Sequence, residues 1–472
     1  MQYLLGLDIG QTKIKTALFT VDGEEYAAFS GDASCMRHGD FAEKDMIGLW
    51  KTVSSLLRTA ASQTAPGEIT AIGVSGHGNG LYPLDKEGRP FINAVLSTDS
   101  RAQSIVDEWN RDGKGKAAFR YTVQHIWAGQ PLPILEWFKR NSPETYRNIG
   151  TVLFCKDYIN YMLTGNCTTD YSDVSAAGVF DNVNKRYDRE LFGIFALENR
   201  FPAVIKSVEK TGRVSIPVAA ETGIAEDTVV AGGCFDAVSS ALGSGALGGY
   251  SITAGTWSIN AAFTDSCVTN GKILQCNLSG DGERWFAVES SPTSAVNLEW
   301  YVNNIRSLTY KECDEIAGKY DSDDVRGIYM PYINSMPRYP RVKSGFFGDF
   351  KNENEKLRAL FEGIAFGHRF HLENLREAGI VRSAVRLSGG LATSALWCQI
   401  LADVLQLPVE VPAVKNPGCL GAALCAGIAA SLYPSLEEAV LRIQTSAVYN
   451  PRCSYDRKYK LFKKKLEELN AG

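Results

Sequence analysis

Apolar and polar residues along this chain alternate in short blocks that predict a mixture of strands and helices. Residues 3–9 form an apolar run and residues 14–20 alternate before an Asp22-Gly23 turn, which predicts two strands joined by a hairpin at Gly10. Residues 44–63 carry apolar side chains at spacings of three and four, the pattern of an amphipathic helix. A strand leading into a glycine-rich loop is expected at 69–80, and a helical, aromatic-rich region from about 101 to 165.

The pattern begins again in the second half of the chain. Residues 228–247 predict a strand, a loop and a helix of small residues, and residues 249–264 predict two further strands. Aligning Gly10 with Gly255 sets IGQTKIKTALF against AGTWSINAAF, each with an apolar strand, a glycine at the bend and an outgoing strand. Two equal halves with a cleft between them are a natural way to hold a phosphate chain from both sides.

The rest of the second half continues as alternating helices and strands. The segments expected to form them are a long helix at 354–379, a strand at 384–390, a helix and a strand within 393–412, and a glycine turn into a helix at 416–430. The tail from 455 to 472 alternates charges at helical spacing and predicts a solvated terminal helix.

Composition narrows the class of protein. A chain of 472 residues exceeds the size at which a single core stops growing, so two domains are expected. A net charge of −4 argues against nucleic acid or an anionic membrane as the main partner. Eleven scattered cysteines predict reduced thiols, with neither disulfides nor a zinc site, and no signal peptide is apparent. These features predict a cytoplasmic protein, and His368 and His371 are interpreted as structural.

The first hairpin carries groups that suit phosphate. Gly10 permits close backbone approach, and the amide and hydroxyl groups of Gln11 and Thr12 can donate to phosphate oxygens. Asp8 could hold Mg²⁺ through water, and Lys15 could reach a terminal phosphate. The alternative is an ordinary glycine hairpin, and no GxxxxGK[ST] loop occurs in the sequence.

A single aspartate, Asp236, lies between small residues in AGGCFDAVSSALGSG, just ahead of the second hairpin. Small neighbours let a ligand come close, and an isolated carboxylate there suits a catalyst that accepts a proton. The alternative is the N-cap of the following helix. One residue can serve both purposes.

Two loop regions supply candidate ligand contacts. His77 and Asn79, and Asp99 after the next strand, can pair with sugar hydroxyls, although an Asn-Gly turn and a helix cap explain them equally. Trp127 could wall a sugar pocket or lie in the core. Gly389 and Gly390 with Ser394, and the PGCLG turn at 417–421, resemble loops that border a nucleotide, although glycines at such turns are also ordinary cap and packing positions.

Taken together, these segments resemble the FGGY family of carbohydrate kinases over nearly the whole chain. The resemblance lies in LGLDIGQTKIKTALF, GVSGHGNGLYPLDKEGRPFINAVLSTDSRA, AGGCFDAVSSALGSG, TAGTWS, and LSGGLATSALWCQILADVLQLPVEVP with PGCLGAALCAG. It implies a two-domain α/β fold like that of actin and hexokinase, with a duplicated mixed-sheet core and an interdomain cleft. The expected domains are residues 1–244, with the sugar site and first phosphate hairpin, and residues 245–472, with the second phosphate hairpin and the adenosine site.

The resemblance also implies the roles of individual residues. Asp236 would be the general base and would also contact the substrate beside His77, Asn79 and Asp99, while Asp8 would lie near Mg²⁺. The residues expected around the phosphates of ATP are Gly10, Gln11, Thr12, Lys15, Gly255 and Thr256. The residues expected beside the adenosine are Gly389, Gly390 and Ser394. Two departures stand out. Gln11 replaces a more usual threonine, and His77-Gly78-Asn79 replaces the Gln-Met-His run of D-xylulose kinases.

The sequence therefore predicts an ATP- and Mg²⁺-dependent kinase for a primary hydroxyl of a small ketose, with a homodimer as a candidate assembly. The appearance is closest to the L-xylulose kinase branch, while 3-keto-L-gulonate, erythritol and D-xylulose stay open as substrates. A non-enzymatic nucleotide switch of the actin or chaperone type is the alternative from another class. A pseudokinase that senses sugar is less favoured, because every expected polar position is filled.

Overall fold

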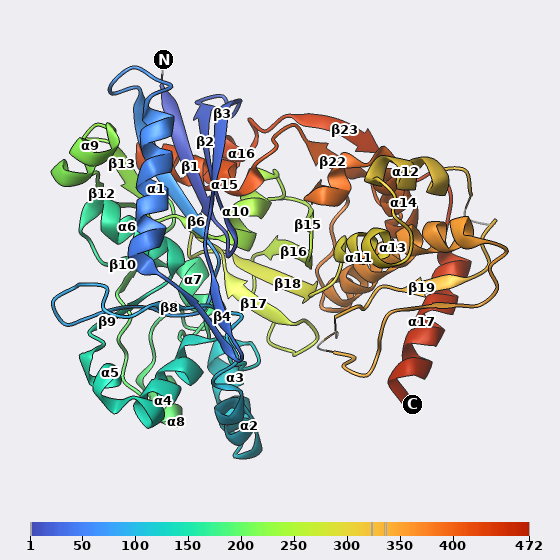
Figure 1. The fold of residues 1–472 in the computed structure, drawn as a ribbon, viewed down its shortest axis with the longest axis horizontal. Helices are drawn as coiled ribbons and strands as arrows, with labels where there is room; N and C mark the ends of the chain where they lie inside the picture. Colours follow the sequence, from blue (N-terminus) through green and yellow to red (C-terminus); the bar gives the residue numbers. More distant parts are fainter. Residues whose placement is uncertain (1, 322–323, 335, 337, 472) are drawn as a thin grey trace. The chain divides into compact units, whose positions relative to one another are not determined.

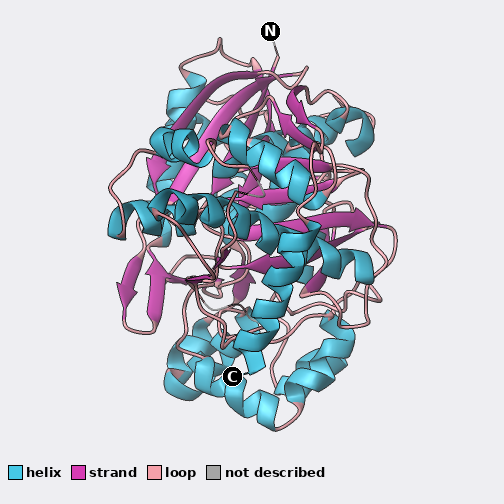
Figure 2. Cartoon of the chain, turned by 90° about the vertical axis from the view of Figure 1, so that its right-hand side faces the viewer, coloured by secondary structure: helices cyan, strands magenta, loops and turns pink. Residues whose placement is uncertain are grey.

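The computed structural model describes residues 2–321, 324–334, 336 and 338–471, and helices alternate with strands throughout them (Figures 1 and 2). The chain divides into two compact units. Unit 1 comprises Met1–Gly245, Phe263–Ala287 and Val414–Ile443, and unit 2 comprises Ala246–Ala262, Val288–Ala413 and Gln444–Gly472. One division thus lies near residue 245, and two later segments return to unit 1.

Unit 1 is built on a mixed sheet in the order β12-β13-β6-β1-β2-β3, with β14 also paired to β6. Its strands are β1 (Tyr3–Ile9), β2 (Lys13–Thr20), β3 (Glu25–Asp32), β6 (Ile69–Gly76), β12 (Lys210–Arg213), β13 (Val229–Ala231) and β14 (Cys234–Phe235). The expected hairpin is present, because β1 and β2 are antiparallel with Ile9 opposite Ile14. Strands β1, β13 and β14 all run parallel to β6.

Helices cover this sheet and close the core of unit 1 (Figure 1). They are α1 (Met46–Ala61), α6 (Cys155–Thr164), α7 (Tyr171–Ala176), α9 (Ile216–Thr222), α10 (Asp236–Gly243), α15 (Pro417–Ala429) and α16 (Leu436–Val440). The expected amphipathic helix at 44–63 is α1, which buries Leu49, Val53 and Leu57. Its N-cap is Asp45, whose carboxylate accepts from the Ile47 N–H.

Glycines allow helix α15 to lie unusually close to β1, β6 and α10. A Cβ atom at Gly6 would lie 1.9 Å from the Cys419 carbonyl oxygen, and one at Gly73 would lie 1.8 Å from that of Ala422. A Cβ atom at Gly421 would meet the Ser239 carbonyl of α10 at 1.9 Å. The glycines of α15 and of the strands beneath it are therefore packing positions.

A second hydrophobic cluster forms the core of the part of unit 1 that contains the aromatic-rich region. Trp109, Phe138, Phe154 and Phe180 are buried in it. The remaining elements of this unit are β4 (Met36–His38), β5 (Phe41–Lys44), β7 (Tyr82–Leu84), β8 (Ala94–Val95), β9 (Thr151–Leu153), β10 (Thr168–Asp170), β11 (Ala203–Ile205), β17 (Gln275–Leu278), α2 (Gln103–Arg111), α3 (Lys114–Thr122), α4 (Pro131–Asn141), α5 (Pro143–Asn148) and α8 (Arg189–Phe195).

Unit 2 repeats the hairpin and its parallel neighbour. Strands β15 (Tyr250–Ala254) and β16 (Ser258–Thr264) are antiparallel, and β15 runs parallel to β21 (Val385–Ser388), as β1 does to β6. In the same sheet β21 is followed by β22 (Val409–Pro412) and β23 (Thr445–Tyr449), while β18 (Trp285–Ser291) lies beyond β16. The internal repeat predicted from Gly10 and Gly255 is therefore present in the topology.

Long helices complete unit 2. Its other elements are α11 (Val296–Asn304), α12 (Tyr310–Ala317), β19 (Ile328–Met330), β20 (Gly345–Phe347), α13 (Glu353–Glu377), the 3₁₀ turn η1 (Gly390–Thr393), α14 (Ala395–Leu405) and α17 (Asp456–Ala471). The expectation of a solvated tail helix is wrong for one face of α17. Tyr459, Phe462 and Leu466 are buried, and Lys458 forms an ion pair with Glu362 of α13.

Two expectations from composition concern cysteines and membranes. All eleven cysteines are thiols, as predicted. Among the described residues, no helix has both the length and the apolar character that crossing a membrane requires.

The two histidines of α13 are structural, as interpreted from the sequence. His368 contacts Ser294 and Asn260, and His371 contacts Glu289.

Candidate active site

Three neighbouring parallel strands of unit 1 bring candidate residues to one edge of the sheet. Ser75 of β6 is paired with Asp8 of β1 on one side and with Cys234 of β14 on the other. His77 follows β6, and Asp236 follows β14. The carboxyl ends of parallel strands are where α/β proteins bind ligands, so this edge is the candidate active site.

Asp236 is the first residue of helix α10 and is half-buried. The expectation that it caps the helix is wrong: the N-cap position is Phe235, and no side-chain cap is present there. Burial and the nearby Asp8 carboxylate raise the pKa of Asp236 to about 7, although a hydrogen bond from the Ala237 N–H opposes the shift. A carboxylate with this pKa can accept a proton near neutral pH.

Asp8 lies at the end of β1, where it is paired with Lys15 across the hairpin. Burial raises the pKa of Asp8, while the Lys15 ammonium and a 3.2 Å hydrogen bond from the Ser75 hydroxyl favour its charged form. Helix α15 begins against it, because a Cβ atom at Gly418 would lie 2.5 Å from Asp8 Oδ2. Gly418 therefore gives the carboxylate the room it occupies.

The hairpin turn is closed by a hydrogen bond of 2.9 Å from the Gly10 N–H to the Lys13 carbonyl. Thr12 and Lys15 are exposed, so both side chains are available to a ligand. The Gln11 side chain is engaged: its amide donates to the Ser97 hydroxyl at 2.9 Å, and its oxygen accepts from the Thr98 hydroxyl at 3.2 Å.

Lys44 supports the hairpin from beneath, which the sequence did not indicate. Its side chain is 1% exposed, and its ammonium donates to the carbonyls of Gly10 at 3.2 Å and Gln11 at 3.0 Å. Burial lowers the pKa of Lys44. The residue lies at the end of β5, far from the hairpin in sequence, and no local motif marks it.

Asn79 Oδ1 is a buried polar atom without a partner among the described residues, whereas the buried His77 ring has a hydrogen bond with the Gly78 backbone. His77 Nε2 is paired with the Tyr82 hydroxyl at 2.9 Å. Burial and the Lys44 charge lower the pKa of His77 to about 3, so the ring is neutral. Asn79 has a left-handed backbone with φ of 61°. Buried polar groups are nearly always satisfied, so Asn79 Oδ1 fits a hydrogen bond to a ligand.

Asp99 is held within the protein. Oδ1 accepts from Arg101 N and Nε, and Oδ2 accepts from Ala42 N at 2.7 Å and Arg101 Nη2 at 2.8 Å. It does not cap helix α2, whose N-cap is Ala102. The Arg101 guanidinium in turn lies over the Phe41 ring at 4.3 Å. A sugar hydroxyl at Asp99 would have to share an oxygen that is already bonded.

Trp127 is 40% exposed, so the interpretation as a core residue is wrong. A Cβ atom at Gly129 would lie 2.6 Å from its ring, and the Gly129 carbonyl accepts from the Gly80 N–H at 2.9 Å. The exposed ring therefore lies beside the loop that carries Asn79.

The second hairpin turns at Gly255, whose N–H donates to the Trp257 carbonyl at 3.1 Å. The start of α11 holds it, because the Ser294 and Ala295 N–H groups donate to the carbonyls of Thr256 and Gly255 at 3.0 and 2.8 Å. A Cβ atom at Gly255 would meet nothing within 4 Å, and Thr256 is exposed. Unit 2 thus presents an open turn that resembles the one in unit 1.

The loop after β21 lies beside this hairpin. Gly389 has φ of +89°, and a Cβ atom there would lie 2.6 Å from the Ala254 carbonyl oxygen, so only glycine fits. Gly389 and Gly390 are exposed, and Gly390 begins η1. Ser394 is the N-cap of α14 and accepts from the Trp397 N–H at 3.1 Å. The glycine turn can therefore approach a flat ligand, while the Ser394 hydroxyl is partly used by its helix.

Models of the FGGY family of carbohydrate kinases match this chain in both halves, the N-terminal domain over residues 3–243 and the C-terminal domain over residues 250–430. The chain belongs to the FGGY family of carbohydrate kinases. This FGGY protein is an ATP-dependent carbohydrate kinase, as the sequence predicted, with the two-domain fold shared by actin and hexokinase.

Relatives of this FGGY kinase include the L-xylulose/3-keto-L-gulonate kinase of Escherichia coli, 32% identical over 93% of this chain and 90% of the relative. The probable L-xylulose kinase of Pasteurella multocida is 31% identical over the full length of both proteins. Among solved structures, the gluconate kinase of Lactobacillus acidophilus is similar with a TM-score of 0.92, 21% identity and coverage of 100% and 99%. A ligand-bound xylulose kinase from the same organism has a TM-score of 0.90, 22% identity and coverage of 100% and 97%.

Few of the described side chains near the candidate active site of this FGGY kinase could coordinate a metal ion. No group of three or more histidine, cysteine, aspartate or glutamate side chains placed to hold a metal occurs in the part of the chain that the structure describes. Asp8 and Asp236 are the acidic pair at the strand edge, and each has a raised pKa. Few protein ligands and several waters are the usual arrangement for Mg²⁺ bound with phosphates, so the residues present fit that ion.

Proposed function

We propose that this kinase transfers the γ-phosphoryl group of ATP to a primary hydroxyl of L-xylulose or a close ketose analogue. The substrate is inferred from the two relatives named for L-xylulose, which cover 93% and 100% of this chain. The observation that carries the chemistry is Asp236, a carboxylate at the end of three parallel strands with a pKa of about 7. The alternative of a non-enzymatic nucleotide switch has no support in a member of a carbohydrate kinase family.

In this proposal Asp236 is the general base. Its carboxylate accepts the proton of the sugar hydroxyl as that oxygen attacks the γ-phosphorus in line. General base catalysis contributes about 10²–10⁴-fold, and positioning and charge neutralisation supply most of the rest. The loss of Asp236 is therefore expected to lower turnover greatly without abolishing nucleotide binding.

The groups around Asp236 suit phosphate and its metal. Mg²⁺, when bound, would neutralise charge on the transferring phosphoryl group, and Asp8 would hold it through water. The turn at Gly10, Gln11 and Thr12 would contact phosphate oxygens, and Lys15 would approach the terminal phosphate. In unit 2 we propose phosphate contacts for Gly255 and Thr256, and adenosine contacts for Gly389, Gly390 and Ser394. Residues 1–244 and 245–472 would be the two functional domains.

Sugar recognition is proposed for the loop after β6. Asn79 Oδ1 is buried without a partner among the described residues, and a hydroxyl of the sugar would satisfy it, with the neutral His77 ring close by in the same loop. Asp99 would contribute an oxygen that it already shares with Arg101. The exposed Trp127 ring offers an apolar face of the kind that packs against the C–H side of a sugar.

A coupled ADP-release assay with a panel of acceptors tests the proposal. L-xylulose should stimulate ADP release more strongly than 3-keto-L-gulonate, D-xylulose or erythritol, and Asp236→Ala should lower kcat by about 10²–10⁴-fold. If another sugar is preferred, the proposed substrate is wrong, but the proposed role of Asp236 as the base is unaffected. If Asp236→Ala turns over at the wild-type rate, Asp236 is not the base. If no acceptor stimulates ADP release, the proposal as a whole is contradicted.

A further inference from the structure

A cluster of four ionisable side chains is buried in unit 1 next to the strand ends of the candidate active site, and burial raises the pKa of two of them, Asp157 and Asp173. The Lys156 ammonium is fully buried and forms ion pairs with Asp157, with Asp170 at 2.9 Å and with Asp173 at 3.2 Å. These residues come from α6, β10 and α7, and each is at most 1% exposed. Burying one cation among three carboxylates is costly, and replacement by apolar residues would often stabilise a fold.

Asp170 connects this cluster to two serines. Its Oδ1 faces Lys156, while its Oδ2 accepts hydrogen bonds of 2.6 Å from the hydroxyls of both Ser172 and Ser207. The Ser172 N–H also donates to Oδ2 at 2.9 Å. Asp170 thus accepts the hydroxyl protons of both serines, so each serine oxygen is still able to accept a hydrogen bond from another group.

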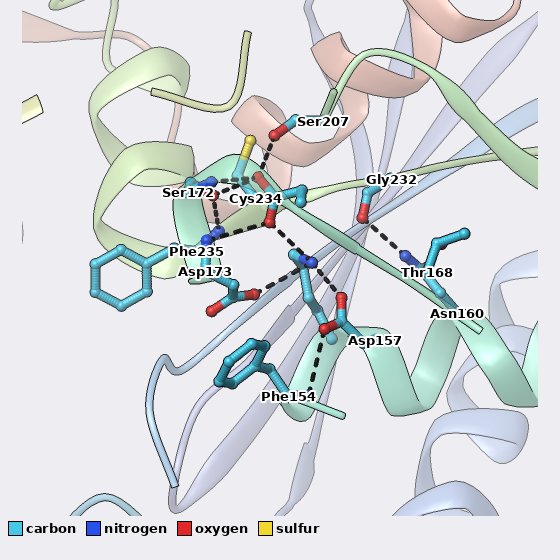
Figure 3. A network of polar contacts seen from close by, with 12 residues as sticks. Phe154, Asp157, Asn160, Thr168, Ser172, Asp173, Ser207, Gly232, Cys234 and Phe235 are labelled. Atoms are coloured by element: carbon cyan, nitrogen blue, oxygen red, sulfur yellow. Dashed lines mark hydrogen bonds and ion pairs between the residues drawn. The ribbon is translucent and has the colours of Figure 1, made fainter. Parts of the chain in front are cut away.

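Ser172 then holds the residue next to the proposed base. Its hydroxyl accepts from the Phe235 N–H at 2.9 Å, and Phe235 immediately precedes Asp236 (Figure 3). The Ser207 carbonyl accepts from the Gly233 N–H at 3.0 Å. Asn160 of α6 donates to the carbonyls of Ala231 at 3.2 Å and Gly232 at 2.8 Å. Groups on both sides of the segment 231–235 therefore fix the backbone that leads into Asp236.

The Lys156 stem also packs against this segment. A Cβ atom at Gly233 would lie 3.4 Å from Lys156 Cδ, and one at Gly76, at the end of β6, would lie 2.9 Å from Lys156 N. The charged cluster and the strand ends that carry the active-site edge are thus in direct contact. A shift of the cluster would move the backbone on which Asp236 stands.

We propose that Asp170 and Ser172, anchored by Lys156, are positioning residues that orient Asp236 for proton transfer through the hydrogen bond from the Phe235 N–H to Ser172. The inference rests on the proposed role of Asp236 as the base. Misplacement of a reacting group by about 1 Å can lower a rate by about 10²-fold, so a single tether has a measurable effect on turnover.

The test compares two serines of the same helix. Ser172 and Ser175 are both buried in α7, and each hydroxyl accepts from a backbone N–H, that of Phe235 at 2.9 Å and that of Leu278 at 2.8 Å. Ser172→Ala should lower kcat by about 10- to 100-fold with both KM values within about threefold, whereas Ser175→Ala should leave kcat within about threefold at a similar loss of Tm. Equal losses of kcat in both variants, or a normal kcat in Ser172→Ala, would overturn the inference.

A double-mutant cycle separates this inference from the function on which it rests. In an Asp236→Asn background, Ser172→Ala should change the residual kcat by less than about threefold, because the base that it positions is gone. Independent, multiplying effects would overturn the positioning role while keeping the base. If Asp236→Asn alone turns over at the wild-type rate, Asp236 is not the base, and the positioning role proposed for Ser172 fails with it. If Ser172→Ala does not fold, Ser172→Cys fills the site with a weaker acceptor and is expected to lower kcat in the same way.

Discussion

Gln11 and Ser97 lie 86 residues apart in the chain and are joined by a hydrogen bond of 2.9 Å from the Gln11 amide to the Ser97 hydroxyl. The Thr98 hydroxyl donates back to the Gln11 oxygen at 3.2 Å. One side chain therefore connects the tip of the proposed phosphate hairpin to the end of the proposed sugar segment. The shorter side chain of threonine, the more usual residue in the sequence pattern, would not span both contacts.

Gln11→Ala should weaken the binding of both substrates, because it removes both hydrogen bonds that hold the two loops together. Each bond contributes about 1 kcal/mol, so KM for ATP and for the sugar should each rise about three- to tenfold, with kcat within about threefold. Steady-state kinetics with each substrate varied in turn measures this. A rise confined to ATP would mean that Gln11 acts on phosphate alone.

Asn79 offers a cleaner test of the sugar site as Asn79→Gly than as Asn79→Ala. Its φ of 61° is strained for alanine, whereas glycine adopts it freely, so the glycine variant removes the amide without distorting the loop. The KM for the sugar should rise about tenfold, while that for ATP stays within about twofold. A rise in the KM for ATP with an unchanged KM for the sugar would show that Asn79 does not contact the sugar.

The strand ends of the candidate site could be predicted from sequence because the signals there are local. Apolar runs that stop at glycine mark β1, β6 and β15, and parallel strands then bring Asp8, His77 and Asp236 to one edge. The helix start was misplaced by one residue, since cap geometry depends on a backbone angle at Phe235 that composition does not reveal.

The buried charges could not be predicted in this way. No local pattern marks Lys44 or Lys156 as buried, and their burial depends on partners distant in sequence, the hairpin carbonyls for Lys44 and Asp170 for Lys156. Asp99 and Arg101 are only two residues apart, but that spacing alone does not predict their ion pair. Exposure of Trp127 depends on how the loop at Gly129 packs, which hydrophobicity alone does not determine.

Turnover should depend on pH through Asp236. Because the base must be ionised and its pKa is about 7, kcat/KM for the sugar should fall roughly tenfold for each pH unit below about 7. An ordinary aspartate would keep the rate level down to about pH 4. A pH–rate profile between pH 5 and 9 measures the acidic limb, and a rate that stays level down to pH 5 would contradict the raised pKa.

The same carboxylate should make the fold less stable as pH rises. The pKa of Asp236 is raised from 3.8 to about 7 in the folded state, so the native protein binds more protons than the unfolded chain between those values. Its contribution to the free energy of unfolding therefore falls as pH rises from about 4 to about 7. Asp236→Asn should be more stable than wild type at pH 8, by about 1–2 kcal/mol after allowance for solvent screening, and similar to it at pH 4. Denaturant unfolding at both values measures the difference, and an equal difference at both would show that titration is not its cause.

Lys44→Met should weaken the binding of the nucleotide. The substitution keeps the apolar stem but removes the ammonium that donates to the Gly10 and Gln11 carbonyls, so the turn loses its support and the site loses a positive charge. KM for ATP should rise about tenfold. The pKa of His77 should also move upward from about 3, because the Lys44 charge is one of the causes that lower it, although burial will keep the ring neutral at pH 7. Kinetics and histidine NMR titration measure the two effects, with Lys51→Met, an exposed position on α1, as the matched control. An unchanged KM for ATP in Lys44→Met, or an equal rise in Lys51→Met, would mean that the buried ammonium supports the fold of the hairpin without contributing to nucleotide binding.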